Sequence, residues 1–267
     1  MIAADARSTV LGLTRTPKHV YSWFDGVTDS GPLPSVTTIL NIVDKSGALV
    51  GWAKRETATC AVRNLDMLAT MRATGGDAAA VNWLKAIPDY QRDTAADIGT
   101  RVHALAESVA RGEAVQPTEE ERPFVVAYRR FMEEWQPRYL AIEDMVASLE
   151  HGYAGTLDAI VEMAGDVYML DVKTGTGIYP ETSLQLAAYS WASFIGRPGD
   201  ATRYAMPKIT AHAVLHLRPE NGGQYEVVPY DVTPRTFEAF LHARSLFEWR
   251  DTQAPTVMGQ PLGRAIK

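Results

Sequence analysis

The stretch "GTLDAIVEMAGDVYMLDVKTG", residues 155–175, predicts the centre of the fold. Both of its halves alternate between apolar and other side chains, which is the period of a β-strand with two different sides. Ala164-Gly165 suits a two-residue turn, and the two halves then form an antiparallel hairpin. In this register Asp158 lies directly opposite Asp171, with their Cβ atoms roughly 4.5–5.5 Å apart.

The alternation also assigns residues to the two faces of the hairpin. We expect Leu157 to share a face with Ala159 and Val161, and Lys173 to share the opposite face with Asp171. The same turn pairs Met163 with Asp166.

The two facing carboxylates need an explanation, because they repel each other unless a cation lies between them. Mg²⁺ or Mn²⁺ prefers oxygen ligands and keeps waters that can react. An ammonium at Lys173 would orient such a water or neutralise a phosphate. The alternative is a solvated ion network of Asp158, Asp171 and Lys173 without a metal.

The composition is typical of a globular protein. The chain has 267 residues, of which 46% are hydrophobic and 22% charged, so it fits one large domain or a domain with an added lobe. Its net charge of -6 gives no overall signal for nucleic acid. A groove can still be basic on an acidic protein.

Cysteine use and hydropathy indicate where the protein works. The single cysteine, Cys60, excludes internal disulfides and any cluster that needs several thiolates. No run of about 18 apolar residues is present, so we expect no membrane span. The first ten residues lack the features of a signal peptide. We therefore expect a cytoplasmic protein, in the host cytoplasm if a phage encodes it.

The rest of the chain predicts helices around a sheet. We expect a strand ending at Asp25-Gly26, then a short helix capped by Ser35. Residues 50–135 have mostly helical patterns, punctuated by Gly75-Gly76, Pro88 and Gly112. Further elements are expected as one strand over 139–150, a helix over 180–196, and strands over 209–219 and 224–232. A closing helix follows, with Thr233 as its cap and Pro234 at its first position.

This order implies an α/β fold with a mixed central β-sheet flanked by helices. We expect residues 1–95 to form a mostly helical accessory region and residues 96–267 to form the core. The two could also be one continuous domain.

Two helical segments add polar groups beside the hairpin. Gln185 and Tyr189 are four residues apart and share a helix face, and their helix begins soon after Lys173. In "DIGTRVHALAE", His103 lies next to the apolar side and can point toward the sheet as a metal ligand. The alternatives are a core tyrosine, a surface glutamine and a histidine without a ligand.

Together "GTRVH", "GTLD", "DVK" and "QLAAY", in this order and spacing, resemble the RecB-like branch of the PD-(D/E)XK nuclease superfamily. The stretches "LPSVTTIL" and "GWAKRETA" are similar to phage-encoded exonucleases of this branch, which resemble CRISPR-associated adaptation nucleases. The close resemblance covers about residues 97–192. It implies a restriction-endonuclease-like core and hydrolysis of DNA phosphodiester bonds with Mg²⁺ or Mn²⁺.

The resemblance also implies roles for individual residues. His103, Asp158, Asp171 and the Val172 carbonyl would bind the metal, and Lys173 would position the attacking water. Gln185 and Tyr189 would hold the DNA strand near the scissile phosphate. Glu143 in "AIEDM" matches an acidic residue that often precedes the G-x-x-D motif, with a structural ion pair as its alternative role.

The chain departs from its relatives at two points. Leu157 stands where the superfamily name has proline, which is common in this branch. The iron–sulfur cluster of several relatives needs four cysteines, so we expect no such cluster here.

Contacts to the DNA backbone are expected from basic residues near the motifs. The candidates are Lys54, Arg55, Arg92, Arg101, Arg129 and Arg130. Trp52 or Tyr153 would stack on frayed bases.

The function indicated by the sequence is a metal-dependent DNA exonuclease in phage DNA recombination or replication. A single-strand annealing protein is a possible partner. An endonuclease or flap nuclease with the same site, and a non-catalytic DNA-end-binding subunit, remain alternatives. The sequence does not fix polarity, strand preference, the number of metals or the oligomeric state.

Overall fold

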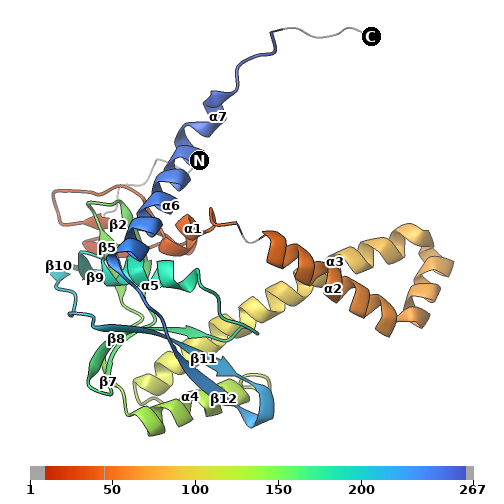
Figure 1. Ribbon diagram of the computed structural model, residues 1–267, viewed down its shortest axis with the longest axis horizontal. Coiled ribbons are helices and arrows are strands. Elements are labelled where there is room, and N and C mark those ends of the chain that lie inside the picture. Colours follow the sequence, from red (N-terminus) through yellow and green to blue (C-terminus); the bar gives the residue numbers. More distant parts are fainter. Residues whose placement is uncertain (1–9, 45, 263–267) are drawn as a thin grey trace.

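A five-stranded mixed sheet forms the centre of the computed structural model, which describes residues 10–44 and 46–262 (Figure 1). Its strand order is β12-β11-β8-β7-β4. The strands are β4 (Arg138–Ile142), β7 (Ala159–Met163), β8 (Asp166–Lys173), β11 (Ala211–Arg218) and β12 (Gln224–Pro229). Strands β8 and β11 are parallel and the other pairs antiparallel. The predicted fold class, a mixed sheet flanked by helices, is confirmed.

The hairpin of β7 and β8 has the predicted register. Met163 pairs with Asp166 and Ala159 with Leu170. Asp158 directly precedes β7 and Asp171 follows Leu170 in β8, so the predicted Asp158–Asp171 position is the next one along, just beyond the paired residues. Ala164 and Gly165 both have positive φ angles, 51° and 89°. Positive φ at both turn residues is the geometry whose twist matches the flanking strands.

The predicted face of Leu157 is wrong. Leu157 packs in the same hydrophobic cluster as Ile160, whereas Val161 and Leu170 pack in another cluster.

 Ala159 belongs to that second cluster. Strand β7 begins only at Ala159, and the chain before Asp158 belongs to a different sheet. The alternation of β7 therefore does not extend to Leu157.

That second sheet has four antiparallel strands in the order β10-β9-β5-β6. Its strands are β5 (Met145–Ser148), β6 (Tyr153–Thr156), β9 (Phe194–Arg197) and β10 (Asp200–Tyr204). An N-terminal sheet of β1 (Gly12–Arg15), β2 (Val20–Phe24) and β3 (Leu33–Pro34) packs on it. Leu13, Trp23 and Phe194 are buried at this contact. Strand β2 ends one residue before Asp25-Gly26, as predicted.

Two predicted boundaries in this region are wrong. The single strand expected over 139–150 is divided into β4 and β5 at Glu143, whose φ angle is 51°. The helix expected over 180–196 ends earlier, as α5 (Thr182–Ser190), and its last residues form β9. Phe194 and Ile195 pair with β5 there, so tertiary pairing overrides the helical pattern.

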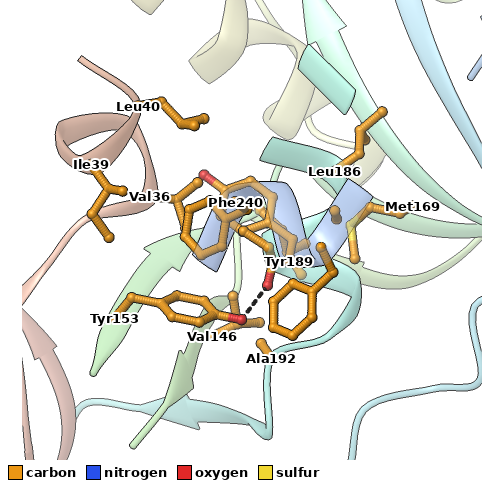
Figure 2. Close-up of a cluster of buried hydrophobic side chains, with 14 of the residues drawn as sticks. Val36, Ile39, Leu40, Val146, Tyr153, Met169, Leu186, Tyr189, Ala192 and Phe240 are labelled. Atoms are coloured by element: carbon orange, nitrogen blue, oxygen red, sulfur yellow. Dashed lines mark hydrogen bonds between the residues drawn. The ribbon is translucent and has the colours of Figure 1, made fainter. Parts of the chain in front are cut away.

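Helices cover both faces of the five-stranded sheet. On one face lie α1 (Val36–Leu40), α5 and α6 (Pro234–Thr252), with Ile160 and Met169 of the sheet in their cluster. Figure 2 shows this cluster around Tyr153, Tyr189 and Phe240. On the other face lie α4 (Arg122–Trp135) and the end of α3 (Leu65–Ala110).

Both predicted caps on the first face are confirmed. The Thr38 amide donates to the Ser35 hydroxyl (3.0 Å) at the start of α1. Thr233 precedes α6, and Pro234 is its first residue. A short helix, α7 (Ala254–Val257), follows α6.

Helix α2 (Ser46–Arg63) and the outer part of α3 extend away from the sheets (Figure 1). Helix α3 bends at Gly76, where φ is 73° and ψ is -179°, and continues through Pro88 without ending. It also continues through the predicted boundary between residues 95 and 96, which stays a prediction. In the part of the chain that the structure describes, no helix is long and apolar enough to cross a membrane.

Candidate metal centre

His103 reaches the site from the inner part of α3. Val102 and Ala106 of this helix are buried against the sheet and α4, which fixes the rotation of the helix. Gly99 lets α3 approach the chain after β8, because a Cβ there would lie 3.1 Å from the Thr174 hydroxyl oxygen. His103 lies next to the buried stripe, as predicted, and it points its ring toward the junction of the two larger sheets.

At that junction two chain segments pass from one sheet to the other side by side. The Glu143 amide donates to the Asp158 carbonyl (3.0 Å), and the Leu157 amide donates to the Asp144 carbonyl (3.0 Å). The left-handed conformation of Glu143 is uncommon for a residue with a side chain. This local geometry brings the Glu143 and Asp158 carboxylates to one place.

His103, Glu143 and Asp158 form a compact group of possible ligands. One atom from each lies within 4.8 Å of the others. The His103 Nδ1 atom is 3.7 Å from Asp158 Oδ1 and 3.9 Å from Glu143 Oε1. Burial alone would lower the pKa of His103, but the Asp158 and Glu143 carboxylates raise it to about 9.

Asp158 is held in place from the neighbouring strand. The backbone amide of Val172 donates to Asp158 Oδ2 at 2.6 Å, so the other carboxylate oxygen is left to face His103. Val172, whose carbonyl is a predicted ligand, therefore also orients a predicted ligand through its N–H.

Asp171 lies on the same strand with a different set of partners. Its Oδ1 atom accepts hydrogen bonds from Lys173 Nζ and Gln185 Nε2, both at 2.9 Å. Its Oδ2 atom is 2.8 Å from the same ammonium but receives no hydrogen bond, although it is buried. Burial and the nearby Asp158 charge raise the pKa of Asp171 to about 6, against the opposing effect of Lys173.

Helix α5 places Gln185 and Tyr189 on the same side, as their spacing predicts. Tyr189 is buried against Gly155, where a Cβ would lie 2.6 Å from the Tyr189 ring. Burial raises the pKa of the Tyr189 hydroxyl well above its usual range. The tyrosine therefore stays protonated and available as a hydrogen-bond donor.

Five of the predicted site residues border one cleft of about 600 Å³ between α3 and the N-terminal sheet, whereas Asp171, Val172 and Lys173 do not line it. His103, Glu143, Asp158, Gln185 and Tyr189 all line it. The structure thus brings Glu143 into the ligand group, while Asp171 lies beside the group and is bonded to Lys173. The catalytic and ligand roles of all these residues stay predictions.

Of the residues predicted to contact DNA, Tyr153 is placed wrongly. Its side chain is 0% exposed, and its hydroxyl donates to the Ala188 carbonyl at 2.8 Å (Figure 2). It packs edge-on against Phe240 and cannot stack on a base. The reason is that Tyr153 begins β6, whose first three residues are buried in the core.

The predicted basic contacts do not line the cleft either. Arg101 forms an ion pair with Glu121 (2.5 Å) between α3 and α4. Arg92 pairs with Asp89 and Asp93, and Arg130 donates to the Gly223 carbonyl. Lys54, Arg55 and Arg129 are exposed on α2 and α4.

Several residues of the cleft have no signal in the sequence. Arg15, His19 and Tyr21 of the N-terminal sheet line it, as does Thr156 of β6. They reach the site only through packing between sheets. The alternation "YAGT" before Asp158 is the one local feature that could have placed Thr156 beside the site.

The donor set fits a divalent cation. Two carboxylates and an imidazole converge. The buried Oδ2 atom of Asp171 forms no hydrogen bond and has the Lys173 ammonium, at 2.8 Å, as its ionic partner. A cation held by the carboxylates would supply the positive charge that protonated His103 otherwise provides. Carboxylate ligands suit Mg²⁺ and Mn²⁺.

Comparison with known proteins adds no identification. No family model matches this chain, and no curated protein matches it.

Proposed function

We propose that this protein is a metal-dependent DNA exonuclease of the RecB-like branch of the PD-(D/E)XK superfamily. One observation carries the proposal. His103, Glu143 and Asp158 come from three separate elements and converge within 4.8 Å, beside the bonded set of Asp171, Lys173 and Gln185. Convergence of this kind is unusual for surface charges, because it leaves several carboxylates crowded in a half-buried place.

The residues that would hold the metal are His103, Glu143 and Asp158, with Asp171 beside them. When bound, Mg²⁺ or Mn²⁺ would activate a water and stabilise negative charge on the phosphate. In the hydrolysis, a bond forms between the water oxygen and phosphorus while the bond from phosphorus to the 3′ oxygen breaks. One water proton ends on that 3′ oxygen, so the products are a 5′-phosphate and a 3′-hydroxyl.

Lys173 acts as a cation in this proposal. Burial would lower its pKa, but the Asp171 and Asp158 carboxylates together raise it. The side chain therefore remains an ammonium at neutral pH and holds the attacking water and the phosphate oxygens by charge. The Asp171 carboxylate keeps this ammonium in place at 2.8–2.9 Å.

Gln185 serves the site through Asp171. Its amide nitrogen donates to the carboxylate, so it is a positioning residue here. Tyr189 lines the cleft as Gln185 does, and its protonated hydroxyl would donate a hydrogen bond to the DNA strand. The proposed setting is phage DNA recombination or replication, with a single-strand annealing protein as the partner.

The test uses end-labelled linear DNA and covalently closed circular DNA, each with Mn²⁺, Mg²⁺ or EDTA. The wild type is compared with Asp171→Asn and with Asp166→Asn. Asp166 is an exposed aspartate at the other end of β8, so its substitution controls for loss of a charge on the same strand.

We expect the wild type and Asp166→Asn to degrade only the linear DNA, and only with metal. Asp171→Asn should lose at least about a hundredfold in rate, since a charged group of the site is removed. Cutting of the circle would instead show an endonuclease. If the wild type leaves both substrates intact with either metal, the proposed nuclease activity is wrong, and the alternative of a DNA-end-binding protein is favoured.

A further inference from the structure

The N-terminal hairpin of β1 and β2 forms one wall of the cleft. Arg15, at the end of β1, pairs with Tyr21 at the start of β2, and both line the cleft together with His19. The inner part of α3 lines the cleft as well, with the small residues Ala95, Ala96 and Gly99 and with Thr100 and Glu107. His103, Glu143 and Asp158 lie in the same cleft. A basic edge therefore shares the cleft with an acidic group.

The turn of this hairpin has a fixed shape. The Thr16 amide donates to the Val20 carbonyl (2.8 Å), and the Thr16 hydroxyl accepts from the Val20 amide (3.2 Å). His19 donates its amide to the Thr16 carbonyl and has a φ angle of 55°. A left-handed residue with a side chain is uncommon, and here it is the one whose side chain borders the cleft.

The hairpin is also tied to the site itself. The Tyr21 hydroxyl hydrogen-bonds the Thr156 hydroxyl (2.8 Å), and Arg15 Nη1 donates to the same oxygen (3.3 Å). Thr156 is two residues before Asp158. The guanidinium of Arg15 is therefore held at a defined place relative to the candidate ligands.

The basic side chains of the hairpin have no carboxylate partner in the part of the chain that the structure describes. Arg15, Lys18 and His19 are exposed, and among residues 10–44 and 46–262 no carboxylate forms an ion pair with any of them. Arg92, Arg101 and Arg111, by contrast, all have carboxylate partners. Cations left free beside a cleft attract an anionic ligand.

We propose that the β1–β2 hairpin is a subsite for the phosphate backbone of a DNA strand, with Arg15 and His19 as its contacts. This inference rests on the proposed nuclease function. A phosphodiester chain suits the arrangement because it carries a charge at every nucleotide. One phosphate lies over the acidic group while its neighbour along the strand meets the hairpin. The small residues of α3 leave room for the sugars and bases.

The hairpin is a positioning element in this proposal, so binding and chemistry are measured separately. The affinity of a fluorescent single-stranded oligothymidylate is measured in EDTA at several salt concentrations. Hydrolysis is measured on the oligonucleotide and on the 4-nitrophenyl ester of thymidine 5′-phosphate, which has no neighbouring phosphate to meet the hairpin.

The variants are Arg15→Gln and His19→Asn. Asparagine tolerates the left-handed conformation of position 19. The control is Arg63→Gln, which removes a charge from α2, a helix that contributes no residue to the cleft lining.

We expect each hairpin variant to bind the oligonucleotide about five- to tenfold more weakly. In Arg15→Gln, which loses a charged contact, the slope of log K against log salt should fall by about 0.7. The KM for the oligonucleotide should rise by a similar factor, with hydrolysis of the small ester unchanged. Arg63→Gln should match the wild type.

Each other outcome is decisive. Hairpin variants that bind and cleave the oligonucleotide like the wild type would overturn the subsite and leave the nuclease standing. Hairpin-dependent binding by a wild type that hydrolyses neither substrate would keep the subsite and overturn the nuclease. A wild type that does not bind the oligonucleotide would overturn the subsite for a single strand, and the assay on linear DNA would then decide the nuclease separately.

Discussion

Gln185 shows how a neutral side chain can support a buried carboxylate through one hydrogen bond. Asp171 is 2% exposed, and Gln185 supplies one of the two hydrogen bonds to its Oδ1 atom. An amide in this position can donate without adding charge. A lysine in place of Gln185 would compete with Lys173 for the Asp171 carboxylate, and a glutamate there would repel that carboxylate.

Replacing Gln185 with methionine should therefore weaken both the fold and the site. The shape is retained, but a hydrogen bond to a charged group is lost, which costs about 1.5–3 kcal/mol of unfolding free energy. Urea denaturation measures this loss, and nuclease rates should fall along with it. Gln91→Met on α3 is the control, and equal effects of the two substitutions would contradict the proposed role.

Gly155 matters for the site because it has no Cβ atom, which lets the Tyr189 ring pack against its backbone. Alanine there would place a Cβ 2.6 Å from the Tyr189 ring, which is buried and would have to shift. We expect Gly155→Ala to destabilise the protein by about 1–3 kcal/mol, the usual range for overpacking. Thermal and urea unfolding would measure it.

The matched control is Gly51→Ala in the interior of α2, where nothing lies within 4 Å of the added Cβ. This change should stabilise the protein by up to about 1 kcal/mol, because alanine loses less backbone entropy in a helix. Opposite signs for the two substitutions are the expected result.

At the scale of elements, the β7–β8 hairpin sets the register on which the site depends. Its turn places Ala164 at a φ angle of 51°, where a Cβ is unfavourable. Asparagine tolerates this conformation and commonly precedes glycine in such turns. Ala164→Asn should raise the unfolding free energy by about 0.5–1 kcal/mol.

The measurement is urea denaturation, with nuclease activity as a second readout that should not change. Gly165→Ala is the opposing control, since it adds a Cβ at a φ angle of 89° and should destabilise by about 1–2 kcal/mol. If Ala164→Asn were destabilising, the turn would not have the geometry described.

The elements also show which parts of the fold are visible in the sequence. The β7–β8 register follows from strict alternation and a turn dipeptide, both of which are local signals. The left-handed Glu143 has no such signal, so one strand was expected where two exist. The sequence pattern of β9 predicts the end of a helix, and only the pairing of β9 with β5 makes this segment extended. Arg15 and His19 were missed because inter-sheet packing alone brings them to the site.

At the scale of the whole molecule, the candidate ligands link parts that are far apart in the chain. His103 is on α3, Glu143 lies between β4 and β5, and Asp158 lies between β6 and β7. A cation bound to all three would stabilise the folded state selectively, since the unfolded chain does not bring them together.

We therefore expect Mn²⁺ to raise the Tm of the wild type and EDTA to reverse the effect. At a concentration a hundred times Kd, the stabilisation should be about 2.7 kcal/mol. Asp158→Asn should remove most of the shift, whereas Asp166→Asn should keep it. An equal shift in both variants would place the ion elsewhere.

The continuity of α3 has a mechanical consequence. The same helix carries His103 at its inner end and, about 40 Å away along its axis, the bend at Gly76. Pro88 lies between them and cannot donate a hydrogen bond to the Leu84 carbonyl, so the helix lacks one internal hydrogen bond there. A helix bends more easily at such a turn, so displacement of the outer segment would be absorbed at Pro88 before it reached the imidazole.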